Sequence, residues 1–148
     1  YGETFYRLAA ERVDDDTARK LLLDLADYEV LHEQTFREMK EAFAAPPDPE
    51  SSYDLDDTAG QYLQAMANGV VFDVDGDPGA RLSGNETVDD FLRMALQMEQ
   101  SSIAFYTGIQ RAMPRSWGPE KVEAIIDEEM SHVVYISHEL AKRHGAKA

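Results

Sequence analysis

The chain has 148 residues, 43% of them hydrophobic, which is enough to build the core of a single domain over 1–148. Lys and Arg number 14 against 29 Asp and Glu, so the formal net charge is −15. Because nucleic acids and anionic lipids bind basic surfaces, we expect neither as a partner. The absence of cysteine excludes disulfides, thiolate metal sites and cysteine catalysis. No apolar run is long enough to span a membrane and no signal peptide opens the chain, so we expect a cytoplasmic protein.

Four long helical segments are predicted, in two pairs. They cover approximately residues 1–13, 17–43, 87–113 and 119–144. The acidic run 14–17 supplies an N-cap and a first turn for the second segment. Thr87 and Asp90 form a weak capping box at the start of the third segment. Pro119 is a favourable first residue for the fourth segment, which stops before Gly145.

The connection between the two pairs, residues 44–86, is unusually long for a compact domain. It is rich in Pro and Gly, and we predict a short helix over 56–68 and a short extended piece over 70–74 within it. A single long crossover is typical of bundles whose second and third helices are not joined by a tight turn. The sequence therefore predicts an all-α, ferritin-like four-helix bundle with one crossover.

Three of the predicted helices carry an apolar stripe that charged or polar side chains interrupt. In the second helix the stripe is Ala18, Leu22, Leu25, Glu29, His32, Phe36, Met39 and Phe43. In the third it is Val88, Leu92, Ala95, Glu99, Tyr106 and Met113, and in the fourth Val122, Ile125, Glu129, His132, Ile136 and Leu140. A carboxylate or imidazole on a core-facing stripe is costly unless something binds it. We therefore interpret these Glu and His residues as ligands.

The spacing of these ligands predicts a metal centre. Glu29 and His32 form a Glu-x-x-His motif, and Glu129 and His132 form a second one. Residues three apart share one helical face, so both side chains can reach the same metal centre. Two such motifs, with a lone Glu such as Glu99 on each other helix, form the dinuclear site of ferritin-like bundles. Because mixed carboxylate and imidazole ligands suit iron or manganese and also accept zinc, we expect two iron ions, with manganese or zinc as alternatives.

The two halves of the chain repeat with an offset of 100 positions. The offset pairs Phe5 with Phe105, Tyr6 with Tyr106, Asp27 with Asp127, Glu29 with Glu129, and His32 with His132. It places the counterpart of Glu99 two residues before Tyr1, so we expect the natural protein to extend upstream and to carry a fourth Glu there. Within the chain, Glu3 is the candidate for a substitute ligand or a carboxylate next to the ligands.

The pattern Glu99-x5-Phe105-Tyr106, with the paired Glu-x-x-His motifs and the long crossover, resembles rubrerythrin-like proteins of the ferritin fold. The resemblance covers both helical pairs. It implies that the bridging carboxylates are Glu29 and Glu129, that the histidines capping one iron each are His32 and His132, and that the terminal ligand is Glu99. It also implies that the hydroxyls of Tyr6 and Tyr106 hydrogen-bond to ligand carboxylates. A homodimer is a further expectation.

The resemblance implies a non-haem di-iron oxidoreductase, active in oxidative stress, that reduces hydrogen peroxide or dioxygen with electrons from an external donor. Two departures weaken a rubrerythrin-type peroxidase cycle. Ser102 occupies the place of an extra carboxylate one turn after Glu99, and the sequence contains no cysteine-ligated rubredoxin domain. Three alternatives remain: a ferroxidase or iron-handling protein, a manganese catalase-type centre, and a structural or interaction bundle with an incidental zinc site.

Overall fold

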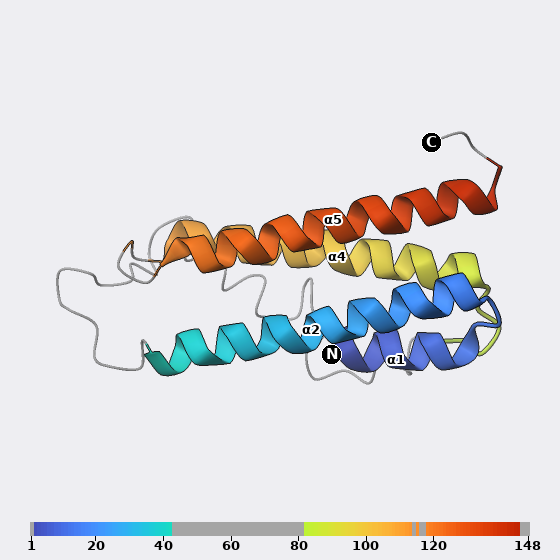
Figure 1. Cartoon of the computed structure of the whole chain (residues 1–148), viewed down its shortest axis with the longest axis horizontal. Coiled ribbons are helices and arrows are strands. Elements are labelled where there is room, and N and C mark those ends of the chain that lie inside the picture. Colours follow the sequence, from blue (N-terminus) through green and yellow to red (C-terminus); the bar gives the residue numbers. More distant parts are fainter. Residues whose placement is uncertain (1, 43–81, 114, 116–117, 146–148) are drawn as a thin grey trace.

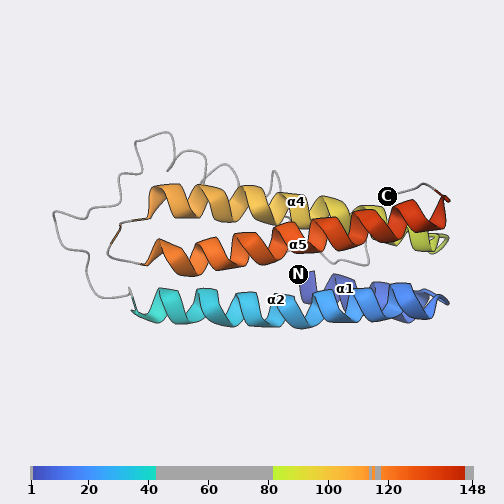
Figure 2. The ribbon, with the colours of Figure 1, turned by 45° about the horizontal axis from the view of Figure 1, so that its top comes forward.

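Two antiparallel helical hairpins lie side by side along their length (Figures 1 and 2). The computed structural model describes residues 2–42, 82–113, 115 and 118–145. These residues form no strand, and their four helices are α1 (Gly2–Arg12), α2 (Asp16–Ala42), α4 (Val88–Ala112) and α5 (Pro119–Arg143). The prediction of an all-helical bundle is therefore confirmed, and each described helix end lies within about two residues of its predicted position.

The residues predicted to start the helices do so by satisfying free backbone N–H groups. Asp15 precedes α2, and its carboxylate accepts a 2.9 Å hydrogen bond from the N–H of Ala18. At α4, the Thr87 side chain accepts from the N–H of Asp90, and the Asp90 side chain accepts from the N–H of Thr87. This reciprocal pair is the predicted capping box. Pro119 is the first residue of α5, as its fixed φ favours.

Helices α2 and α4 run in the same direction, whereas the helices within each hairpin run in opposite directions (Figure 1). The chain leaves α2 at one end of the bundle and enters α4 at the other end. A tight turn cannot join two parallel helices, which is the reason for the long connection. The short helix predicted over 56–68 and the extended piece predicted over 70–74 lie outside the described residues, as do most of residues 44–86.

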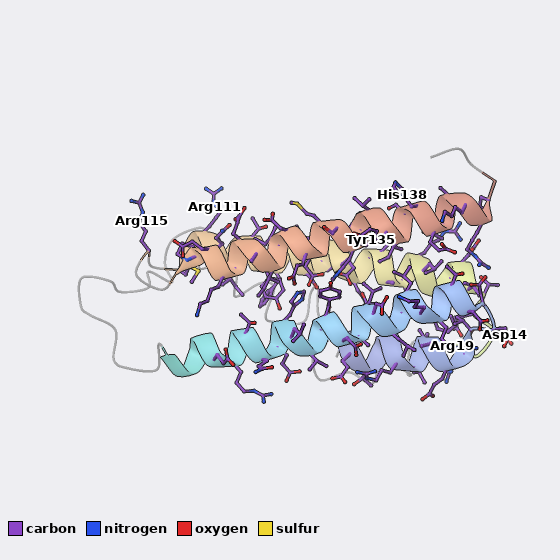
Figure 3. The ribbon with its side chains drawn as sticks, viewed as in Figure 1. Asp14, Arg19, Arg111, Arg115, Tyr135 and His138 are labelled. Carbon is purple, nitrogen blue, oxygen red and sulfur yellow. The ribbon has the colours of Figure 1, made fainter. Side chains whose placement is uncertain are left out.

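The apolar stripes form the core, and side chains of both hairpins extend into the space between them (Figure 3). The main cluster joins all four helices and includes Phe5, Leu22, Leu92 and Ile136, each no more than 2% exposed. A second cluster, built around Val122 and Ile126, lies between α4 and α5. Burial of these side chains is the dominant favourable term that holds the hairpins together.

Polar contacts fix the end of the bundle that holds the turn between α1 and α2, both within each hairpin and between the two. Arg19, labelled near this turn in Figure 3, donates to the carbonyls of Val13 at 2.6 Å and Ala10 at 3.3 Å. It thereby satisfies two backbone acceptors where α1 ends. Arg143, at the end of α5, pairs with Asp15 at 2.7 Å and with Asp89 of α4 at 2.8 Å. None of the described helices is long and apolar enough to cross a membrane.

Candidate metal centre

The structure brings the five predicted ligands together at the middle of the bundle, in two groups that share one residue. The first group is Glu29, His32 and Glu129, and the second is Glu99, Glu129 and His132. Within each group one ligand atom per residue lies within 4.8 Å of the others. Helix α2 supplies the first motif, α4 the lone Glu, and α5 the second motif. Each group therefore has the size of a cation site, and Glu129 belongs to both.

The carboxylate of Glu129 lies between the two histidines. Its Oε1 is 2.8 Å from Nδ1 of His32, and its Oε2 is 3.6 Å from Nδ1 of His132. Nδ1 of His132 is also 3.4 Å from Oε2 of Glu99. Because each oxygen of Glu129 faces a different histidine, this carboxylate has the geometry of a bridge between two adjacent cations.

The centre is buried, and some of its polar atoms have no hydrogen bond. Glu129 is 0% exposed and Glu99 is 1% exposed. Among the described residues, neither oxygen of Glu129 nor Nδ1 of His32 has a hydrogen-bond partner, although Oε1 of Glu129 and Nδ1 of His32 lie 2.8 Å apart. A buried polar atom without a partner is costly, and a carboxylate more so. Two divalent cations would satisfy all three atoms, so the donor set fits a dinuclear metal site.

Electrostatics at the centre also fit a cation. Burial and the negative charge of Glu129 raise the pKa of Glu29 to about 7. Burial by itself would raise the pKa of Glu129 as well, but the two neighbouring histidines outweigh it and hold that pKa below its usual value. Two carboxylates that repel each other in a buried space are the arrangement that a bound divalent cation stabilises.

Tyr6 contacts the carboxylate of a predicted ligand, Glu99. Its hydroxyl, on α1, donates a 2.7 Å hydrogen bond to Oε1 of Glu99 on α4. The ring is 0% exposed, and burial raises the pKa of the hydroxyl well above its usual value. The phenol therefore stays protonated, so it can serve only as a donor to the carboxylate.

Tyr106 lies close to the centre but contacts it differently. Its ring packs edge-on against His32 with centroids 6.4 Å apart. Burial, with the charges of Glu29 and Glu33, raises the pKa of Tyr106 to about 12. The described residues provide no hydrogen bond from this hydroxyl to a ligand carboxylate, so the predicted contact of Tyr106 stays a prediction.

Near the start of α1, the chain approaches the centre through its backbone. A Cβ atom on Gly2 would lie 2.8 Å from Oε2 of Glu29, so only glycine leaves this carboxylate its present position. Glu3 lies in neither ligand group, and its carboxylate pairs with Arg7 at 2.9 Å on the surface. Its role as a substitute ligand stays a prediction, as does that of the Glu expected upstream of Tyr1.

Two residues next to the histidines, Glu128 and Tyr28, were not predicted from the sequence. The carboxylate of Glu128 lies 2.7 Å from Nε2 of His32. The ring of Tyr28 packs on His132 with centroids 4.6 Å apart. The repeat offset of 100 pairs Tyr28 with Glu128, which is the signal that could have directed attention to them.

No protein-family model matches the chain. No curated protein and no solved structure matches it either. The resemblance to rubrerythrin-like proteins therefore depends on the motif residues alone.

Proposed function

We propose that the chain is a ferritin-like, rubrerythrin-like non-haem di-iron oxidoreductase that reduces hydrogen peroxide or dioxygen. The observation that supports the proposal best is the position of Glu129. Its two buried oxygens have no hydrogen bond from any residue that the structure describes, and each faces a different histidine. That arrangement is the one expected of a carboxylate that bridges two metal ions in a helical bundle.

In the proposed centre, each of the five ligands and Tyr6 has its own role. Glu129 and Glu29 would hold both irons together, His32 and His132 would each bind one, and Glu99 would complete the second position. The chemistry that ferrous iron would supply when bound is the transfer of electrons to the oxidant. Tyr6 fixes the orientation of Glu99 through its hydrogen bond. The negative charge of the carboxylates would stabilise iron in both its ferrous and its ferric state.

Apolar neighbours keep bulk water away from the centre. Leu25, Ala95, Ile125 and Ile136 lie about one turn from the ligands on their helices and are at most 4% exposed. A low-dielectric environment without bulk water strengthens the electrostatic interactions between the ligands and the metal. It also limits the oxidants that enter to small molecules, which suits hydrogen peroxide and dioxygen.

Metal stoichiometry tests the proposal first. The protein is loaded anaerobically with ferrous iron, desalted and analysed for iron per chain. We expect two irons per chain, both lost in Glu129→Ala and in the isosteric Glu129→Gln. Glu120→Gln is the matched control, since Glu120 is an exposed carboxylate in the first turn of the same helix and should leave both irons bound. No iron, or a single zinc, would contradict a di-iron centre.

Turnover then tests the reaction. The reduced protein is mixed with hydrogen peroxide or with dioxygen, and reduction of each oxidant is followed with a chemical reductant present. An oxidoreductase keeps its two irons over many turnovers. A ferroxidase instead consumes ferrous iron as its substrate and releases ferric product, so retained iron distinguishes the two activities.

A further inference from the structure

Glu128 and His32 form a contact that crosses from one hairpin to the other. Glu128 lies on α5 and His32 on α2, and Oε2 of the carboxylate is 2.7 Å from Nε2 of the ring. The histidine side chain is 3% exposed, whereas the glutamate side chain is 48% exposed. An ion pair between two exposed side chains contributes little, but this contact fixes a buried ring from the edge of the core.

The contact determines which nitrogen of His32 carries hydrogen. A carboxylate only accepts hydrogen bonds, so Nε2 of the ring must be the donor to Glu128. In a neutral imidazole the other nitrogen, Nδ1, then has a free electron pair. That nitrogen lies 2.8 Å from Oε1 of Glu129 and has no hydrogen-bond partner in the described part of the chain. Nδ1 of the ring thus directs its free electron pair at the first ligand group.

We propose that Glu128 is a positioning residue for His32. Glu128 holds the ring in the Nε2–H tautomer and directs Nδ1 at the metal position beside Glu129. The inference rests on the proposed function, since it assigns a role toward the metal that the five ligands bind. Carboxylates that accept from the second nitrogen of a metal-bound histidine raise its basicity and orient its ring. Glu128 itself need not contact the metal.

The second histidine has a different neighbour. The position that the repeat pairs with Glu128 is Tyr28, whose ring packs on His132 at 4.6 Å between centroids. Within the described residues, the carboxylates that contact His132 are those of Glu99 and Glu129, and both lie beside Nδ1. The two metal positions are therefore inequivalent, and only the one at His32 depends on Glu128.

Titration with cobalt(II), followed by its visible absorption and by calorimetry, tests this assignment. Wild-type protein should bind two equivalents. In Glu128→Gln the affinity of one equivalent should fall about 10- to 100-fold while the other is unchanged. Asp127→Asn is the matched control, because Asp127 is the exposed neighbour of Glu128 and should leave both affinities unchanged. The melting temperature of the metal-free protein should be similar in all three.

Combining Glu128→Gln with loss of one histidine identifies the position affected. In His132→Ala, adding Glu128→Gln should weaken the remaining metal about 10- to 100-fold. In His32→Ala it should have no further effect. Equal weakening in both backgrounds, or unchanged affinity in both, would overturn the role of Glu128.

The tautomer of His32 supplies a second readout, which does not require either histidine to be removed. In the zinc-loaded protein, 15N-detected spectra of the histidine rings should show His32 with hydrogen on Nε2. The Nε2–H signal should be exchange-protected in wild-type protein and lose that protection in Glu128→Gln. A His32 with hydrogen on Nδ1 would overturn the inference, whereas failure of wild-type protein to bind any metal would instead contradict the proposed function.

Discussion

The hydroxyl of Tyr6 donates a 2.7 Å hydrogen bond to Oε1 of Glu99, and the two residues come from different hairpins. Both side chains are at most 1% exposed, so no water competes for this contact. A carboxylate held by a buried donor is restricted to one orientation. The packing of α1 against α4 therefore has a direct consequence for a ligand of the candidate metal centre.

Tyr6→Phe removes this donor while it keeps the aromatic ring. We expect the affinity for the metal at the group of Glu99 to fall by about 10-fold, because that ligand loses its orienting partner. The free energy of unfolding of the metal-free protein should fall by about 1 kcal/mol, the usual net contribution of one hydrogen bond. Metal titration and urea denaturation measure the two effects.

The matched control is Tyr135→Phe, since Tyr135 is 59% exposed on α5 (Figure 3). It removes the same hydroxyl from a surface side chain and should change neither quantity. If Tyr6→Phe lowered stability but left both metal affinities unchanged, Tyr6 would be only a core residue.

Glu99→Gln and Glu129→Gln should differ in the number of metals lost. Glu99 belongs to one ligand group, so its replacement should leave one metal tightly bound, whereas replacing the shared Glu129 should release both. Iron per chain after desalting measures the difference. The same stoichiometry in both variants would show that the two groups do not act as separate positions around one bridge.

Gly2→Ala tests the close approach of α1 to Glu29. The added Cβ would lie 2.8 Å from Oε2 of Glu29, so that carboxylate must move away from its present position. Because the atom displaced is the end of a flexible side chain, the metal-free protein should keep its melting temperature. Metal affinity at the group of Glu29 should fall, which titration with cobalt(II) detects.

The matched control for this variant is Thr4→Ala, an exposed position two residues further along α1. It should leave metal affinity unchanged. A large loss of stability in metal-free Gly2→Ala would mean that the added methyl group displaces the helix rather than the carboxylate.

Helix periodicity explains why the positions of the candidate ligands in the bundle could be predicted from sequence. Residues that recur every three or four positions face the core whatever the details of packing, and Glu29, His32 and Glu129 are members of such stripes. The Thr87 capping box was predicted for a similar reason, since its contacts are local. The burial of candidate ligands inside a bundle can therefore be predicted before the structure is known.

Contacts at the border between two helices cannot be predicted from helix periodicity. Glu128 and Tyr28 lie beside the buried stripes, and whether such a residue touches a histidine of the other hairpin depends on how α2 and α5 pack. Glu3 illustrates the same limit, because its contact with Arg7 depends on side-chain conformation at the surface. The short helix predicted over 56–68 lies outside the described residues.

The raised pKa of Glu29 predicts how stability changes with pH in the metal-free protein. Its value is about 7 in the folded chain, against 4.5 for an unperturbed Glu, so the folded state binds a proton that the unfolded state has released. This contribution is fully present below pH 4.5 and is lost as pH rises through about 7. The size of the loss is of order 3 kcal/mol at most, since each pKa unit corresponds to about 1.4 kcal/mol.

Urea denaturation of metal-free wild type and Glu29→Gln between pH 4.5 and 8 isolates this contribution. Glu29→Gln cannot titrate at this position, so its stability should fall less steeply with pH than that of wild type. Bound metal should reverse the trend in wild type, because the cation binds the ionised carboxylate that higher pH favours. Parallel pH profiles for the two metal-free proteins would show that Glu29 ionises normally. Repulsion between Glu29 and Glu129 would then no longer support a cation at this position.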